Sequence, residues 1–237
     1  MIKQITCLHR LPGLSMEEFQ DHWLGRHAGL VASERRVRRY VQYHRIANDP
    51  VYEALSQAES AEVEPYDGFS VTWWDDIADI SQSKLARDDE HYFIDTARSL
   101  VCLTEERVVV EPEGTLPYVL FECLRKRADI DRATFSDIWW EHRAIGQQAN
   151  GLGLLMGYIQ NCTLPEDDAR AAAIGGNGPE AWDGIVAAYF ESIAKLKALL
   201  SSPLASEESF EDERRFMDHS QGSYAVTRRH VIKDVIR

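Results

Sequence analysis

The side chain best suited to chemistry is a histidine within an apolar helical pattern. Phe19, Trp23, His27 and Leu30 follow one another at spacings of four, four and three residues, so they share one face of a helix. A face this apolar packs on a sheet, where burial lowers the pKa of an imidazole below its reference value of about 6.5. His27 is therefore predicted to be a neutral base that can remove a proton from an acidic carbon or hydroxyl without a metal or cofactor.

Tyr40 is the natural partner of His27, because a phenol can donate a hydrogen bond to a developing oxyanion. Tyr40, Gln42 and His44 alternate onto one face of the following strand. A core histidine and an ordinary strand aromatic remain the structural alternative for His27 and Tyr40. The residues expected to bind a substrate beside these two are Trp23, Gln42, His44, Trp73 and Cys7.

The elements that position these residues follow from the periodicity of the first half. Residues 2–9 alternate as a strand, and Ser15 with Glu18 forms a capping box at the start of the helix. Further segments are predicted as a strand over 37–46, a strand over 66–74, a helix over 77–85 and a strand over 107–111. This order is the β-α-β-β-α-β arrangement of a ferredoxin-like unit.

The chain then repeats this pattern. An offset of 116 residues, which becomes 118 for the second strand and returns to 116, aligns the two halves colinearly. Two prolines and a glycine within 111–117 mark the joint, so the predicted domains are 1–112 and 113–237. The aligned pairs include Cys7 with Cys123, Trp23 with Trp139, Tyr40 with Tyr158, and Gln42 with Gln160.

Two such halves can bury the bare faces of their sheets against each other. The predicted fold class is α+β, with two tandem ferredoxin-like halves packed sheet to sheet as an intramolecular pseudo-dimeric barrel. One chain thereby does what a homodimer does with two, and a further homodimer remains open.

The first half resembles the EthD family of dimeric α+β barrel proteins. The resemblance rests on Leu11-Pro12-Gly13-Leu14-Ser15, on the Phe19-to-Ala28 helix with its F-x-x-x-W-x-x-x-H pattern, on Arg39-Tyr40-Val41-Gln42, and on Tyr66-Asp67-Gly68-Phe69 leading into Trp73-Trp74. It covers nearly all of the first half and is weaker in the second.

The resemblance implies a pocket between helix and sheet, lined by the residues that match His27 and Tyr40. Families on this scaffold include cofactor-independent lactone isomerases, dehydratases and cyclases, oxygenases of quinol-like substrates, and haem-binding proteins. We expect a lyase or isomerase, free of cofactor and metal, that acts on a small aromatic or lactone-like substrate. The alternatives are a haem-binding or cofactor-free oxygenase, and a non-catalytic small-molecule-binding protein.

The second half departs from the pattern at the predicted base. The 116-residue offset places Arg143, preceded by His142, at the position of His27, while Tyr158 matches Tyr40. An arginine stays protonated at neutral pH and cannot act as a base. The second site is therefore expected to be structural or to bind an anion, and the first half to hold the single active pocket.

Composition and charge disfavour some classes of binding partner and location. The formal net charge of −13 disfavours nucleic acid, and no apolar run has the length of a membrane span. The four cysteines are widely spaced, which favours free thiols and a cytoplasmic location. Long polar segments over 47–65 and 165–181 are either mobile connections or lids over a pocket.

Overall fold

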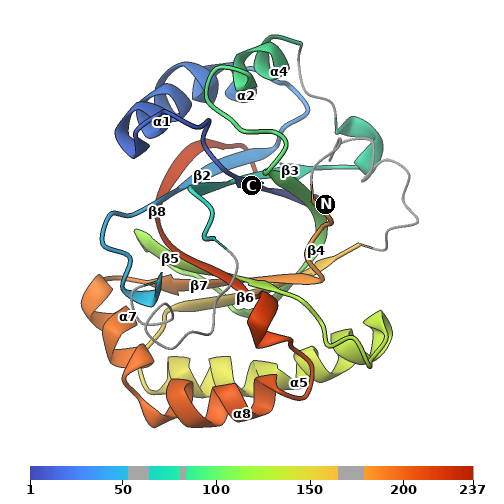
Figure 1. The fold of residues 1–237 in the computed structure, drawn as a ribbon, viewed down its shortest axis with the longest axis vertical. Helices are drawn as coiled ribbons and strands as arrows, with labels where there is room; N and C mark the ends of the chain where they lie inside the picture. The colour runs from blue at the N-terminus through green and yellow to red at the C-terminus, as the bar shows by residue number, and fades with distance from the viewer. Residues whose placement is uncertain (53–63, 81–83, 165–178, 237) are drawn as a thin grey trace.

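Eight antiparallel strands close into one barrel in the order β1-β3-β2-β8-β5-β7-β6-β4 (Figure 1). The computed structural model describes residues 1–52, 64–80, 84–164 and 179–236. The strands of the first half are β1 (Ile2–Leu8), β2 (Arg39–Arg45), β3 (Gly68–Trp74) and β4 (Leu100–Val110), and those of the second are β5 (Tyr118–Leu124), β6 (Gly157–Thr163), β7 (Gly184–Phe190) and β8 (Ser223–Asp234).

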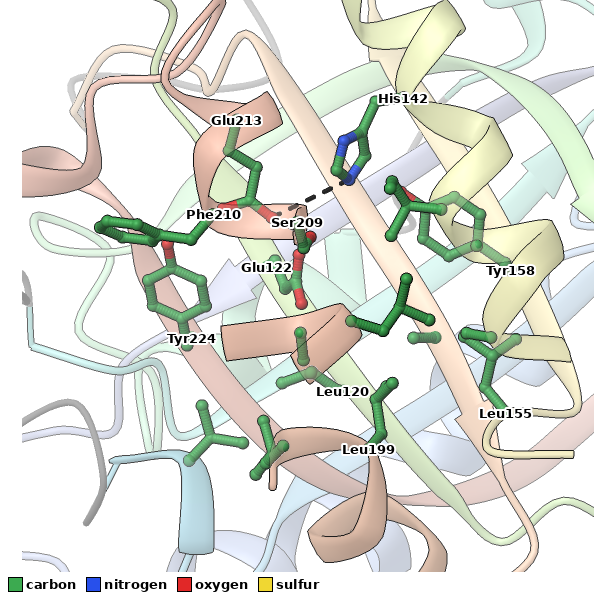
Figure 2. Close-up of a pocket in the computed structure, with 18 of the residues that line it drawn as sticks. Leu120, Glu122, His142, Leu155, Tyr158, Leu199, Ser209, Phe210, Glu213 and Tyr224 are labelled. Atoms are coloured by element: carbon green, nitrogen blue, oxygen red, sulfur yellow. Dashed lines mark hydrogen bonds and ion pairs between the residues drawn. The ribbon is translucent and has the colours of Figure 1, made fainter. Parts of the chain in front are cut away.

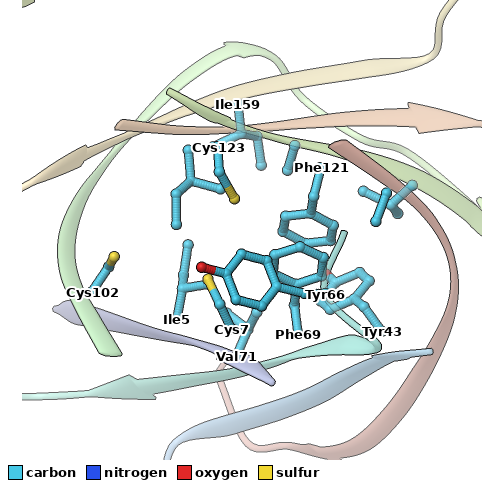
Figure 3. Packing of buried hydrophobic residues seen from close by; sticks show 14 of the residues in the cluster. Ile5, Cys7, Tyr43, Tyr66, Phe69, Val71, Cys102, Phe121, Cys123 and Ile159 are labelled. Carbon is cyan, nitrogen blue, oxygen red and sulfur yellow. The ribbon is translucent and has the colours of Figure 1, made fainter. Parts of the chain in front are cut away.

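The barrel consists of two four-stranded sheets, one from each half. Pairing of β2 with β8 and of β4 with β6 joins the sheets at both edges. The inward side chains of both sheets form one apolar core (Figure 3), in which Phe69 stacks on Phe121 at 4.2 Å between ring centroids. The prediction of two ferredoxin-like halves that bury their sheets together is confirmed.

Helices cover the outer face of each sheet, so the barrel lies between two helical layers (Figure 1). The predicted capping box is present, since Ser15 accepts a hydrogen bond from the backbone of Glu18 and the Glu18 carboxylate accepts one in return. No helix in the described ranges has the long apolar stretch that crossing a bilayer requires. The helical segments are α1 (Met16–His22), η1 (Trp23–His27), α2 (Ala28–Ala32), η2 (Ile77–Asp79) and α4 (Lys84–Glu90) in the first half, and α5 (Arg132–Gly151), α7 (Ile193–Leu200), η3 (Leu204–Ser209), α8 (Phe210–Glu213) and η4 (His219–Gln221) in the second.

Some element boundaries differ from the sequence prediction. The last strand of the first half begins at Leu100 and not at 107, because its early part pairs with β1 and its later part with β6. The helix predicted over 77–85 is a short turn at Ile77–Asp79, and α4 begins at Lys84. Most of the two predicted loops lies outside the described residues, and the division at residue 112 stays a prediction.

Candidate active site

His27 lies between the helices and the sheet of the first half, where it is 4% exposed. Its Nδ1 is 3.2 Å from Oδ2 of Asp89 in α4, and its ring packs on Phe93 with 5.0 Å between centroids. Burial lowers the pKa of His27, although the carboxylate of Asp89 acts in the opposite direction. The structure thus places His27 where the helical pattern predicted, with one ring nitrogen already held by a carboxylate.

Tyr40 takes part in a buried hydrogen-bond network beneath the helix. Its hydroxyl accepts hydrogen bonds from Nε1 of Trp23 at 3.2 Å and from Nε2 of Gln42 at 2.7 Å. Burial raises the pKa of Tyr40 to about 12. His44 continues the network, with Nε2 2.9 Å from Oε1 of Gln42 and its ring stacked on Trp23 at 4.4 Å. These four residues lie together as the sequence predicted, but Tyr40, Gln42 and His44 fill the space under the helix.

Cys7 and Trp73 lie on the opposite face of the sheet. Both belong to the core inside the barrel, together with Tyr43, and Trp73 Nε1 donates a hydrogen bond to Glu106 at 3.0 Å. The prediction that they line a cavity with Tyr40 is wrong, because side chains alternate along a strand and the sheet separates the two faces.

A small cavity of about 40 Å³ lies beside His27. A volume of this size holds little more than one or two water molecules. It is lined by Gln4, Thr6, Leu8, Trp23, His27, Leu30, Val31, Glu34, Val37, Ser70, Thr72, Trp74, Ala86, Glu90 and Ile94.

The second half repeats the buried histidine. The first-half helix contains a π-helical turn at η1, which inserts one residue that the continuous α5 lacks. Past this turn the offset between the halves falls from 116 to 115, so the counterpart of His27 is His142. His142 Nδ1 lies 2.8 Å from Oδ2 of Asp212, and its ring packs on Phe216 at 5.4 Å. Each half therefore holds an inward imidazole paired with an aspartate.

The prediction that Arg143 takes the place of His27 is wrong for the same reason. The guanidinium of Arg143 lies 4.5 Å from the ring centroid of Trp140, and its Nη1 donates to the Trp140 carbonyl at 2.6 Å. Arg143 thus packs on its own helix, and the expected inward arginine for binding an anion is not found there.

The second half contains a larger cavity, of about 200 Å³, between its helices and its sheet (Figure 2). Tyr158 lines this cavity, whereas its counterpart Tyr40 does not line the small one. Val51 of the first half also contributes to the wall, so both halves form the cavity. The other lining residues are Leu120, Glu122, His142, Ile145, Gly146, Ala149, Leu155, Ala188, Leu199, Leu200, Leu204, Ala205, Ser209, Phe210, Glu213, His219 and Tyr224.

Smaller side chains in the second half explain the difference in volume. The chain's own duplication supplies the comparison, because the two cavities occupy equivalent places. A Cβ at Gly146 would lie 2.5 Å from a ring carbon of Tyr158, so only glycine lets the helix approach that ring. The residues that open the second cavity are Ala149 in place of Glu34 and Ala188 in place of Thr72, while Gly146 in place of Val31 makes room for the ring of Tyr158.

Glu122 on β5 directs its carboxyl group into the larger cavity (Figure 2). Burial, and after it the negative charge of Glu213, raise the pKa of Glu122 to about 8. A carboxyl group with this proton affinity is suited to general acid–base catalysis near neutral pH. Sequence reasoning missed Glu122 because an acidic residue on a strand face resembles a solvated one. The duplication held a usable signal, since its counterpart is the uncharged Thr6.

Glu213 joins several polar groups at one end of the cavity. Its Oε1 accepts a hydrogen bond from Oγ of Ser209 at 2.7 Å, and its Oε2 is 2.9 Å from Nε2 of His219. His142 Nε2 lies 3.8 Å from Oε1. The sequence analysis identified His142 and Tyr158 among these residues, but not Glu213, His219 or Tyr224.

Neither of the described cavities is large enough for haem, whose binding the resemblance had given as an alternative. Nδ1 of His27 contacts Asp89, and the cavity beside the ring measures about 40 Å³. An apolar cavity of about 150 Å³ accepts benzene, and a porphyrin is several times larger than benzene. The second-half cavity of about 200 Å³ is also too small.

Comparison with known families confirms the resemblance. The EthD domain matches residues 11–97 and 127–220, one segment in each half. None of the curated proteins matches the sequence.

Solved structures share the fold along nearly the whole chain. An anthrone oxidase-like protein superposes with a TM-score of 0.58 at 8% identity, over 99% of this chain and 94% of the other. A protein provisionally assigned as a monooxygenase, from Fusobacterium nucleatum subsp. nucleatum, gives 0.56 at 7% identity, over 98% and 92%. A mutant of chlorite dismutase from Candidatus Nitrospira defluvii gives 0.52 at 12%, over 98% and 91%. At these identities the similarity establishes the fold alone.

Proposed function

Because the chain belongs to the EthD family, we propose that it is an enzyme of the kind found on this scaffold, a cofactor-free oxygenase. Its substrate is a small, uncharged hydroquinone-like molecule that binds in the second-half cavity, and Glu122 is the base. The observation that carries this proposal is the position of the Glu122 carboxyl group within a mostly apolar cavity.

The size and charge of the cavity define the substrate. A volume of about 200 Å³ exceeds the roughly 150 Å³ that benzene requires, so one or two fused rings fit. Two carboxyl groups, Glu122 and Glu213, line the cavity together with no lysine or arginine among its described lining residues. A carboxylate or phosphate on the substrate would be repelled, whereas an uncharged hydroxyl can donate a hydrogen bond to either carboxyl group.

The proton affinity of Glu122 suits this substrate. A phenolic hydroxyl has a pKa of about 10, and the pKa of Glu122 is raised to about 8 by burial and by Glu213. Proton transfer from phenol to carboxylate is then only modestly uphill. The alternative base, His27 in the first half, lies beside a cavity of about 40 Å³ that cannot hold a ring.

The reaction balances without a further reductant. Glu122 removes a hydroxyl proton, and the resulting anion transfers electrons to dioxygen as a carbon–oxygen bond forms at the ring. The hydroperoxide then loses water, leaving a carbonyl on a carbon that carried hydrogen. One oxygen atom stays in the product, and the other leaves as water with two substrate hydrogens. The substrate is oxidised and dioxygen is reduced. The names of the anthrone oxidase-like and monooxygenase structures support oxygen chemistry on this fold.

The test is oxygen consumption with one-ring and two-ring hydroquinones in the wild type and in Glu122→Gln. We expect kcat/KM to rise with pH through about 8 in the wild type, and to fall by about 10²- to 10⁴-fold in the variant. Glu105→Gln, which removes an exposed carboxylate from β4, is the matched control and should leave turnover unchanged.

Four outcomes would contradict the proposal. Full turnover by Glu122→Gln would remove Glu122 as the base. Product formed equally fast under argon would indicate a lyase or isomerase, and binding without any product would indicate a non-catalytic protein. An equal loss of kcat/KM in a folded His27→Ala variant would indicate that the reaction takes place in the first half.

A further inference from the structure

We propose that Tyr224 is a further catalytic residue, whose hydroxyl donates a hydrogen bond to the substrate oxygen that Glu122 deprotonates. The assignment rests on the proposed function for the role of Glu122, and it adds the group that stabilises the negative charge left on the substrate. Two observations carry it: the pairing of the two residues across neighbouring strands, and the weak acceptor to which the Tyr224 hydroxyl is bonded.

Glu122 and Tyr224 are direct neighbours on the sheet side of the cavity. Glu122 on β5 is the register partner of Tyr224 on β8, and the side chains of such partners share one face of the sheet, with Cβ atoms about 4.5–5.5 Å apart. Both residues line the cavity (Figure 2). Tyr158 on β6 is two strands away from β5. A ligand oxygen bound at Glu122 is therefore next to Tyr224.

The hydroxyl of Tyr224 is available to a ligand. In the part of the chain that the structure describes, its one hydrogen bond goes to Sδ of Met217, at 3.9 Å. A thioether is a weak acceptor, and a phenolic hydrogen rotates about its C–O bond to suit a better one. An oxygen atom, above all a charged one, is a much stronger acceptor than this sulfur. The hydrogen bond can thus pass to a ligand without movement of the ring.

The ring of Tyr224 is held in a fixed place as a protonated donor. A Cβ at Gly222 would lie 2.8 Å from the Tyr224 hydroxyl oxygen and 2.8 Å from Cε of Met217, so the three residues are in close contact. Burial, and after it the charges of Glu122 and Glu213, raise the pKa of Tyr224, and the phenol keeps its proton. A donor fixed in this way needs little reorganisation when charge develops on the ligand.

The first half lacks both groups at the equivalent place. The register partners there are Thr6 and Val101, so both members of one cross-strand pair differ between the halves, and the second half has an acid and a phenol. The next pair along the same face of the second half is apolar, Leu120 with Val226. Two polar groups at one point of an otherwise apolar face suit the recognition of a single oxygen on an apolar ligand.

The proposed step assigns each proton. When Glu122 accepts the substrate proton, the O–H bond of the substrate breaks and the electron pair stays on its oxygen. Tyr224 keeps its own proton, and its hydrogen bond passes from Sδ of Met217 to that oxygen. Because this bond is stronger to the anion than to the uncharged hydroxyl, it favours the proton transfer.

The test is a pH titration of bound 4-nitrophenol, a one-ring phenol whose ionised form is yellow. It is made in Glu122→Gln, so that the probe titrates without the neighbouring carboxyl group. We expect the added change Tyr224→Phe to raise the midpoint of the bound probe by about one unit or more, a loss of bound phenolate of about tenfold or more, because a hydrogen bond to a charged oxygen is lost.

Tyr118→Phe in the same background is the matched control. Tyr118 lies on β5, is not among the lining residues of the cavity, and accepts a hydrogen bond from Nη2 of Arg228 at 3.0 Å. Its loss should leave the midpoint unchanged. Equal midpoints in the Tyr224→Phe and Tyr118→Phe variants would overturn the inference, and so would a probe that does not bind.

A second measurement uses the chain with Glu122 intact. Tyr224→Phe should lower kcat for oxygen consumption by about 10²-fold and change KM less, because the hydrogen bond strengthens only as charge forms on the substrate. The titration consumes no oxygen and needs no base, so it can succeed where the proposed oxygenase reaction fails, and it can fail where that reaction proceeds. The two failures are therefore distinguishable.

Discussion

Filling the second-half cavity should stabilise the protein and weaken ligand binding at the same time. Ala188 on β7 is 4% exposed and lines the cavity, so Ala188→Val adds two methyl groups to empty space. Valine also suits a strand. Burial is worth about 0.8 kcal/mol per carbon, which sets an upper bound of about 1.6 kcal/mol, and we expect about 1 kcal/mol. For a chain of this size the midpoint of thermal unfolding should rise by about 2–4 °C.

The adjacent residue provides the control. Ala187 lies on the same strand but points into the barrel core and is 1% exposed. Ala187→Val forces the same two methyl groups into a filled interior, so it should destabilise the protein by about 1–3 kcal/mol. Thermal and urea unfolding of both variants measure the contrast, and calorimetry with a two-ring hydroquinone should show at least about tenfold weaker binding to Ala188→Val. A loss of stability in Ala188→Val similar to that in Ala187→Val would show that the cavity is closed in solution and refute the reasoning.

Two further predictions concern the packing beneath the helices. Burial lowers the pKa of His44 to about 3, so the unfolded chain binds the proton more tightly, and stability is lost as pH falls below about 6.5. The free energy of unfolding should be about 2 kcal/mol smaller at pH 5 than at pH 7 from this residue, and His44→Gln should remove that part of the difference in urea titrations. A Cβ at Gly68 or Gly184 would lie 2.5 or 2.4 Å from the indole of Trp23 or Trp139, and at Gly68 also 2.8 Å from the backbone oxygen of Tyr43. Gly68→Ala and Gly184→Ala should therefore each cost about 1–3 kcal/mol in the same assay. A neutral effect of Gly184→Ala would show that the indole of Trp139 moves aside freely.

The fold could be predicted from the sequence because its signals are local and repeated. Alternating strands, a capping box at Ser15 and the aligned tryptophans Trp23 and Trp139 are each visible in a single chain, and the barrel follows from burying two bare sheet faces. The boundary of β4 could not be found this way, because its first residues gain their pairing from β1, which is distant in sequence.

The site was harder to predict because it depends on one inserted residue and on missing side-chain volume. The π-helical turn at Trp23–His27 changes the register by one, and an alignment by constant offset then places Arg143 where the structure has His142. Periodicity correctly predicted that Trp23, Tyr40, Gln42 and His44 lie together. It carries no information about whether a cavity remains beside these residues. The second-half cavity results from the small side chains of Ala149 and Ala188, and small residues leave no positive signal in a single sequence.

A duplicated chain separates structural features from functional ones by its own internal comparison. The histidine–aspartate pairs His27–Asp89 and His142–Asp212 occur in both halves, although the cavities beside them differ about fivefold in volume. A feature that persists where no substrate fits is explained by packing and hydrogen bonding alone. The carboxyl group of Glu122 and the space around it occur in the second half alone. Burying that carboxyl group and leaving that space unfilled both cost stability, and ligand binding is the benefit that would maintain them in one half after the other half had filled its cavity.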